Sequence, residues 1–163
     1  MKTFVYIFAG IILLLIESSV LSFFPVDFFK PDLSIPFIIY TTFFLGPLSG
    51  FITSVFTSLF QEILSNAPNG SMIFAKLSIF LLAFFLRKKL YIDSKYSFSY
   101  ICTGSAVLES FLFLMLSIIS KGETSNIVNV IFYTIPNAIF TGFISIFIFL
   151  LIESMNMRFL NRE

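Results

Sequence analysis

Long apolar runs, broken only by short polar or charged segments, make up almost the whole chain. Hydrophobic residues account for 58% of its 163 residues, and charged residues for only 12%. A soluble domain is typically about 45–50% apolar and about 25% charged, so the polar residues present here cannot cover a surface that faces water. The sequence therefore predicts an all-α integral membrane protein.

The apolar runs predict about six transmembrane helices in a single domain that covers residues 1–163. A helix crosses the hydrocarbon with roughly 20 residues, about 17–25 in practice. The expected spans are residues 3–24, 32–45, 47–64, 71–86, 99–119 and 127–152. The second span is short, and only the segment GPLSG separates it from the third. We expect a tight turn there, because one helix over both spans would exceed the thickness of a bilayer.

The first expected span also has features of a cleavable signal peptide, because Lys2 precedes its apolar stretch. That stretch is longer than a typical h-region of about 7–15 residues, and it contains Glu17. We therefore expect it to remain in the protein as a membrane span.

Basic residues outside the spans fall mostly on one side of the predicted topology. With a cytoplasmic N-terminus, the cytoplasmic set is Lys2, Arg87, Lys88, Lys89, Lys95, Arg158 and Arg162. Only Lys30 and Lys121 fall in outer loops. The positive-inside rule therefore predicts that both termini are cytoplasmic. The short loops leave no room for a soluble catalytic domain.

Several classes of site are excluded by composition. The chain has no histidine and one cysteine, Cys102, so it cannot form a Cys/His zinc site, a Cys/His dyad, a CxxC pair or an internal disulfide. Its net charge of +1 excludes a broad basic surface for nucleic acid. Because the serines have no histidine partner, we expect no enzymatic activity, no metal and no cofactor.

Charged residues inside the spans are candidates for a functional site, since each costs roughly 2.5–3.5 kcal/mol on insertion scales and is usually paired. Glu62 lies near the outer end of the third span, and Lys76 lies about a turn and a half into the fourth. We expect these two residues to form an ion pair, with Gln61 and Asn66 hydrogen-bonding nearby. The alternative is that both charged side chains reach separately to the outer interface.

Two further acids lie deep in apolar segments: Glu17 in the first span and Glu109 near the middle of the fifth. Buried acids can mark the path of a proton, which would suggest a proton-coupled carrier. A path would need a chain of titratable groups, whereas these are two isolated acids on separate helices. We favour a structural role, or contact with a helix of a partner.

Small and polar residues recur at helical spacing and predict close helix packing. The candidate packing residues along the third span and beyond its two ends are Gly46, Gly50, Ser54, Ser58 and Gly70. A second, more polar stripe follows the sixth span beside Gly142 and Pro136: Asn129, Tyr133, Asn137, Thr141 and Ser145. Polar groups would be unsatisfied against lipid, so both stripes are expected to face protein or a hydrated groove.

Four segments follow one another along the chain: KPDLSIPFIIY, a glycine-rich turn, SVFTSLFQEILSNAPNGSMIFAK and RKKL. Their order resembles the family of the rod shape-determining protein MreD. That family has Pro-Asp or Pro-Asn at the start of the second helix, where this chain has Pro31 and Asp32, and often an acid in the fifth helix, where it has Glu109. We also expect Asp32 to cap the second helix and interact with its dipole.

The resemblance extends to a later family motif, G-x-x-x-G-x-x-x-D-[LI]-[LI]-S-G-x-x-x-G. The matching residues are Gly50, Ser54, Ser58, Glu62, Ile63, Leu64, Ser65 and Gly70. The chain departs from the motif with Glu62 in place of Asp, Asn66 in place of Gly, and serine at some glycine positions.

The resemblance implies a non-enzymatic scaffold of the cell-elongation machinery in the bacterial inner (cytoplasmic) membrane. Such a scaffold would bind the bitopic protein MreC and support peptidoglycan synthesis that depends on MreB, RodA and a class B penicillin-binding protein. The family fold is similar to the substrate-binding subunits of energy-coupling-factor transporters, so a vitamin-type transport subunit is the alternative. Those subunits usually carry Ala-x-x-x-Ala in the first helix, where this chain offers only Ala9 and Gly10.

Overall fold

The computed structural model describes residues 32–64, 70–90, 92, 94–121 and 127–155, and the single positions 8, 10, 12, 15 and 19. These residues are almost entirely helical and include no strand, which confirms the all-α prediction. The elements are α2 (Ser34–Tyr40), the π-helical continuation η1 (Thr41–Leu45), α3 (Pro47–Leu64), α4 (Ser71–Arg87), α5 (Lys95–Lys121) and α6 (Ile127–Met155).

The helix bounds follow the apolar runs closely. α3 covers the expected residues 47–64, and α4, α5 and α6 extend beyond their expected spans by only a few residues. The first expected span, residues 3–24, lies almost wholly outside the described residues. One position within it is placed by packing: a Cβ added to Gly10 would lie 3.8 Å from the Phe37 ring and 3.9 Å from a Thr57 methyl group. Gly10 therefore lies against α2 and α3.

The second expected span, residues 32–45, is too short to cross a membrane by itself. α2 and η1 comprise 7 and 5 residues, about 18 Å of helix at most, whereas the hydrocarbon is about 30 Å thick. Every residue of α2 is buried. A helix that is apolar around its whole circumference belongs in a core, and α2 is the central helix of the fold.

Two of the described helices are long and apolar enough to cross a membrane. The qualifying segments are Lys95–Leu116 in α5 and Ile131–Ser154 in α6. The fold is thus all-helical with two candidate spans among the described residues. α3 and α4, with 18 and 17 residues, are less apolar or shorter than these two segments.

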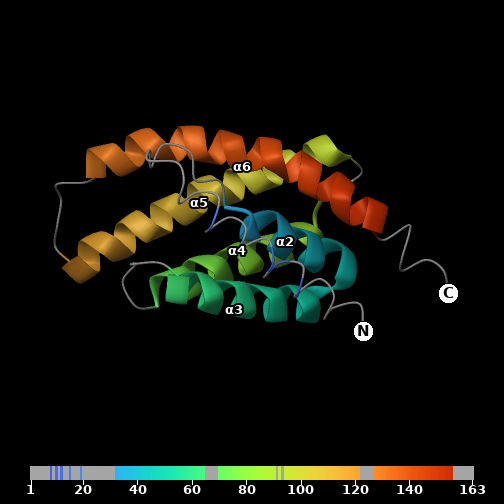
Figure 1. The fold of residues 1–163 in the computed structure, drawn as a ribbon, viewed down its shortest axis with the longest axis horizontal. Helices are drawn as coiled ribbons and strands as arrows, with labels where there is room; N and C mark the ends of the chain where they lie inside the picture. Colours follow the sequence, from blue (N-terminus) through green and yellow to red (C-terminus); the bar gives the residue numbers. More distant parts are fainter. Residues whose placement is uncertain are drawn as a thin grey trace.

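The turn expected within GPLSG is present at Gly46. Gly46 has φ 116°, a conformation that L side chains rarely adopt, and the chain reverses there so that α3 runs back alongside α2 (Figure 1). Gly70 has φ 84° at the start of α4. Among the described residues, a Cβ added at either position would have no neighbour within 4 Å. These two glycines form turns, so the prediction that they pack helices together is wrong.

Gly50 does serve as a packing residue. A Cβ there would lie 2.1 Å from Thr42 Oγ1 and 2.9 Å from the Thr42 Cα, so α3 and η1 approach closely only because the side chain is absent. Ser54 and Ser58 are fully buried, and their hydroxyls donate to the carbonyls of Phe51 and Val55 in the same helix. Gly50 thus lies at a close approach of two helices, and Ser54 and Ser58 are buried on the same helix.

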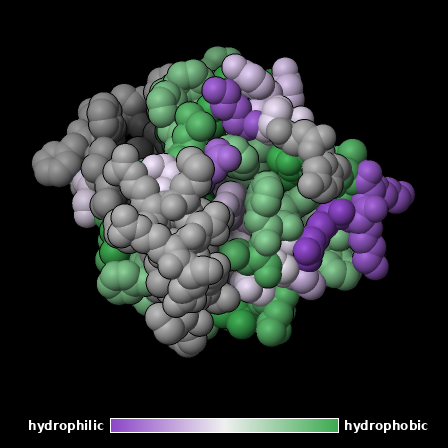
Figure 2. All heavy atoms as spheres, turned by 90° about the vertical axis from the view of Figure 1, so that its right-hand side faces the viewer, coloured by the Kyte–Doolittle hydropathy of each residue, from purple (hydrophilic) through white to green (hydrophobic). Residues whose placement is uncertain are grey.

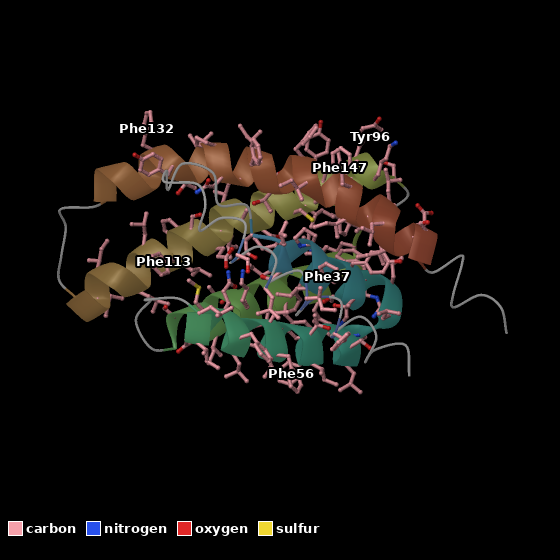
Figure 3. All side chains as sticks on the ribbon, in the orientation of Figure 1. Phe37, Phe56, Tyr96, Phe113, Phe132 and Phe147 are labelled. Atoms are coloured by element: carbon pink, nitrogen blue, oxygen red, sulfur yellow. The ribbon has the colours of Figure 1, made fainter. Side chains whose placement is uncertain are left out.

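The helices form two antiparallel pairs around α2. Figure 1 shows α3 along one side with α4, and α5 with α6 along the other, while α2 lies between the pairs. The interior and exterior differ little in polarity. Phe37 is buried in the centre, whereas Phe56, Phe132 and Phe147 point outward and are 45%, 66% and 59% exposed (Figure 3).

Candidate functional site

A lysine is completely buried at the centre of this apolar fold. Lys76 lies on α4 and is 0% exposed, on the same helical face as Ala75, Ile79 and Ala83, which are also buried. A buried ammonium is costly unless it is paired and hydrogen-bonded. The groups that pair with Lys76 are therefore the starting point for the candidate site.

The Lys76 ammonium lies between two carboxylates from other elements. It contacts Asp32 Oδ2, just before α2, and Glu109 Oε1, at the middle of α5. The Asp32 and Glu109 side chains are 15% and 12% exposed. We call Asp32, Lys76 and Glu109 the ion cluster. It joins three elements that are well separated in the sequence.

The Asp32 carboxylate accepts hydrogen bonds from four donors. Oδ1 accepts the backbone N–H and the hydroxyl of Ser34, at 2.8 and 2.5 Å. Oδ2 accepts the Gln61 amide at 2.9 Å, together with the Lys76 ammonium. The bond to the Ser34 N–H satisfies the first turn of α2, as expected for a capping carboxylate, although the residue directly before the helix is Leu33.

The ion cluster lies about midway along the long helices α5 and α6. The length of α2 explains this position. Glu109 is near the centre of α5. The Asp32 backbone N–H donates to Thr141 Oγ1, near the centre of α6, at 3.2 Å. α2 with η1 is about half as long as α5 or α6. It therefore extends only from the middle of the fold to one end of its long axis (Figure 1). Its first residues therefore meet Lys76 in the interior rather than at an interface.

A cavity of about 180 Å³ lies beside the ion cluster. Its polar lining comes from the two acids of the cluster and from α5 and α6, and its apolar lining from α4, α5 and α6. The described residues that line it are Asp32, Met72, Ala106, Glu109, Ser110, Phe113, Asn137, Ala138 and Thr141. Asn137 and Thr141 belong to the polar stripe on α6, so the expectation that this stripe faces a groove holds for this part.

Further toward the C-terminal end of α6, the same polar stripe packs α6 tightly against α5. Ser145 is fully buried and donates to the Gly142 carbonyl at 2.6 Å, which also accepts the Ser99 hydroxyl at 2.6 Å. A Cβ added to Gly142 would lie 1.9 Å from Thr103 Oγ1. The stripe therefore has two functions along its length: lining the cavity and packing.

The predicted ion pair between Glu62 and Lys76 is wrong. Glu62, near the end of α3, accepts the backbone N–H of Gly70 and thereby satisfies the start of α4. Lys76 instead points toward the interior, where two carboxylates meet it. Gln61 is hydrogen-bonded close to Lys76, as expected, but its partner is Asp32.

Three of the predicted positions, Glu17, Pro31 and Asn66, lie outside the described residues. Sequence reasoning identified Asp32, Lys76 and Glu109 as candidates but did not predict that they meet. It treated Asp32 only as a cap. The signal that was available is the short length of the second apolar run, because a half-length helix can start inside the fold beside longer helices.

The arrangement can hold charge and accept hydrogen bonds in an apolar interior. Its carboxylates, ammonium, amide and hydroxyls link α3, α4, α5, α6 and the start of α2. No protein-family model, curated protein or solved structure matches this chain.

Proposed function

We propose that the chain is a multi-pass inner-membrane scaffold of the MreD type. It binds an MreC-like bitopic membrane protein and thereby supports MreB- and RodA-dependent peptidoglycan synthesis with a class B penicillin-binding protein. The observation that carries this proposal is the ion cluster. Two of its three members, Asp32 and Glu109, are residues on which the resemblance to that family rests, and the cluster uses its charges to join helices.

A membrane location is supported by the exposed surface. In an 18-residue window of Lys95–Leu116 only 22% of the residues are buried, and in one of Ile131–Ser154 only 33% are, so many side chains of these apolar helices are not packed inside the fold. Large apolar side chains cover that outer face, for example Phe111 at 59%, Ile119 at 77% and Ile139 at 61% exposure. An exposed apolar surface of this extent marks contact with lipid or protein.

Cytoplasmic termini are supported by the distribution of basic residues. Arg87, Lys88 and Lys89 are exposed where α4 ends, close to Lys95 at the start of α5. Figure 2 faces this end of the molecule and shows hydrophilic residues among apolar ones. Lys88 lies over the Phe84 ring, 5.0 Å from its centroid, which suits a cation at a membrane interface.

A scaffold role requires that polar groups serve packing and partner contacts. The buried hydroxyls of α3 are satisfied within their own helix, and the Asp32 carboxylate is filled by Ser34, Gln61 and Lys76. These groups rigidify the fold. In this proposal, outward apolar side chains of α5 and α6 pack against a transmembrane helix of the partner.

The proposal is tested by co-purification. The tagged chain and an MreC-like protein are expressed together in bacterial membranes, solubilised in mild detergent and purified on the tag. We expect the MreC-like protein to be retained, whereas an unrelated bitopic protein at equal expression is washed out. Retention of neither protein, with the chain folded by circular dichroism, would contradict the scaffold function.

The cavity beside the ion cluster gives a specific reason to consider a vitamin-type transport subunit. Its size argues against this alternative. Pockets for drug-sized ligands are typically about 300–1,000 Å³, whereas this cavity is about 180 Å³. Mass spectrometry of the purified protein separates the two functions, because a vitamin-capturing subunit retains its vitamin through purification. We expect no vitamin to be retained.

A further inference from the structure

The ion cluster is unbalanced in both charge and hydrogen bonding. Asp32 and Glu109 supply two carboxylates, whereas Lys76 supplies one ammonium. The acceptor sites of Asp32 are filled by Ser34, Gln61 and Lys76. Glu109 contacts the Lys76 ammonium through Oε1 and lies within hydrogen-bonding reach of the Asp32 carboxyl group. Among the described residues no donor reaches Glu109 Oε2, so the unused acceptor capacity of the cluster lies on Glu109, which lines the cavity.

Two hydroxyl groups share the cavity with this carboxylate. Ser110 Oγ donates to the Ala106 carbonyl at 3.1 Å, and Thr141 Oγ1 accepts the Asp32 N–H at 3.2 Å. A hydroxyl oxygen carries two lone pairs, so both oxygens retain acceptor capacity. Three acceptors, one of them anionic, thus line a space that corresponds to on the order of six water molecules at about 30 Å³ each.

We propose that this cavity binds a primary ammonium group with a short alkyl stem. Its three N–H donors match the acceptors on Glu109, Ser110 and Thr141, and its charge balances the second carboxylate of the cluster. The side chains of Met72 and Phe113 form an apolar wall suited to the methylene groups of the stem. A quaternary ammonium group has the same charge but no N–H to donate, so the site discriminates against it.

This site goes beyond the proposed scaffold function and does not depend on it. It concerns the chain alone, so binding is measured with no partner protein present. A chain that fails to retain an MreC-like protein still binds the ammonium group if the cavity acts as we propose, and the reverse combination is equally distinguishable. A free alkylamine and the ethanolamine headgroup of a lipid present the same chemistry to the site.

The test is isothermal titration calorimetry of the purified full chain in detergent with ethylammonium chloride and, as the matched control, choline chloride. We expect ethylammonium to bind at least about tenfold more tightly than choline. Glu109→Gln, which removes the charge and keeps the shape, is expected to weaken ethylammonium binding at least about tenfold, as loss of a charge-assisted hydrogen bond implies. Glu62→Gln changes a carboxylate that does not line the cavity and should leave binding unchanged.

A variant that fills the cavity tests the contribution of its space independently of the charge on Glu109. Ala138 lines the cavity and is 2% exposed, so Ala138→Leu fills the space while leaving the ion cluster intact. This variant is expected to abolish ethylammonium binding. Equal affinity for ethylammonium and choline in the wild-type protein, or no binding of either, overturns the proposal without any variant. Unchanged ethylammonium binding in folded Glu109→Gln or Ala138→Leu also overturns it.

The source of the ammonium group is distinguished in nanodiscs. If the lipid headgroup is the ligand, the wild-type chain unfolds at a higher temperature in phosphatidylethanolamine than in phosphatidylcholine, and Glu109→Gln loses this difference. If the ligand is a free amine, ethylammonium raises the unfolding temperature in phosphatidylcholine nanodiscs, and the lipid exchange has no effect. Both outcomes support the proposal, and the absence of both overturns it.

Discussion

Replacing Lys76 with methionine tests the central role of the ion cluster. Methionine is unbranched and of similar length, so it fills the volume while removing the cation that contacts both Asp32 and Glu109. Removing one partner of a buried ion pair typically costs about 3–5 kcal/mol, because the remaining charge is buried without compensation. Lys76 is 0% exposed, so the full range applies.

The two carboxylates do not share this loss equally. Without Lys76, Asp32 keeps the two donors of Ser34 and the Gln61 amide. Glu109 loses its contact with the ammonium and keeps the neighbouring Asp32 carboxyl group, which has the same sign of charge. Most of the predicted 3–5 kcal/mol therefore arises at Glu109. Adding Glu109→Gln to Lys76→Met should then recover more than half of the lost free energy of unfolding, since an uncharged amide is much less costly to bury.

The free energy of unfolding is measured by titration of detergent-solubilised protein with sodium dodecyl sulfate, followed by circular dichroism. Lys88→Met is the matched control, since Lys88 is exposed and lies over Phe84, an interaction worth about 1 kcal/mol or less. A loss for Lys76→Met within 1 kcal/mol of this control would refute the reasoning, as would the absence of rescue by Glu109→Gln.

Two further predictions concern packing and the α3–α4 connection. Gly50→Ala should destabilise the fold by about 1–3 kcal/mol through overpacking against the Thr42 backbone. Gly104→Ala is the control and should be neutral or slightly stabilising, because no described residue lies within 4 Å of the added Cβ. Equal effects of the two changes in the same titration would contradict the close approach of α3 and η1. A double-mutant cycle of Glu62→Gln and Lys76→Gln should be additive within about 0.5 kcal/mol, because the two side chains have different partners. A larger coupling would restore the direct pair that the sequence suggested.

Helix bounds were predictable because charges and turn residues interrupt apolar runs. α3 occupies residues 47–64 as expected, and the reversal at Gly46 follows from a glycine placed between two apolar segments. Such boundaries depend only on local sequence. The same local reasoning assigned Gly70 to packing, although its backbone conformation makes it a turn residue. Spacing alone does not reveal whether a small residue lies inside a helix or just before it.

The partner of Lys76 could not be predicted because it depends on the rotation of α4 about its axis. In a soluble protein the polar face of a helix shows which side points outward. On α4, apolar side chains occupy both faces: Ile79 is buried, while Leu81 is 51% and Phe85 63% exposed. Sequence proximity therefore favoured Glu62, whereas the fold turns Lys76 toward acids that are distant in the chain.

These observations indicate how an almost uniformly apolar chain specifies one arrangement of helices. Sliding α4 by one turn, about 5.4 Å, would place Ile79 where Ala75 is buried and Ala83 where Ile79 is buried. Overpacking at one site and a cavity at the other would oppose the slide. The same slide would carry Lys76 away from Asp32 and Glu109 and leave buried charges unpaired, at about 3–5 kcal/mol for each broken pair. Packing and charge pairing thus oppose other registers together. We infer that the ion cluster reinforces the register of α4 and, because Asp32 lies just before the half-length helix α2, also fixes where that helix starts.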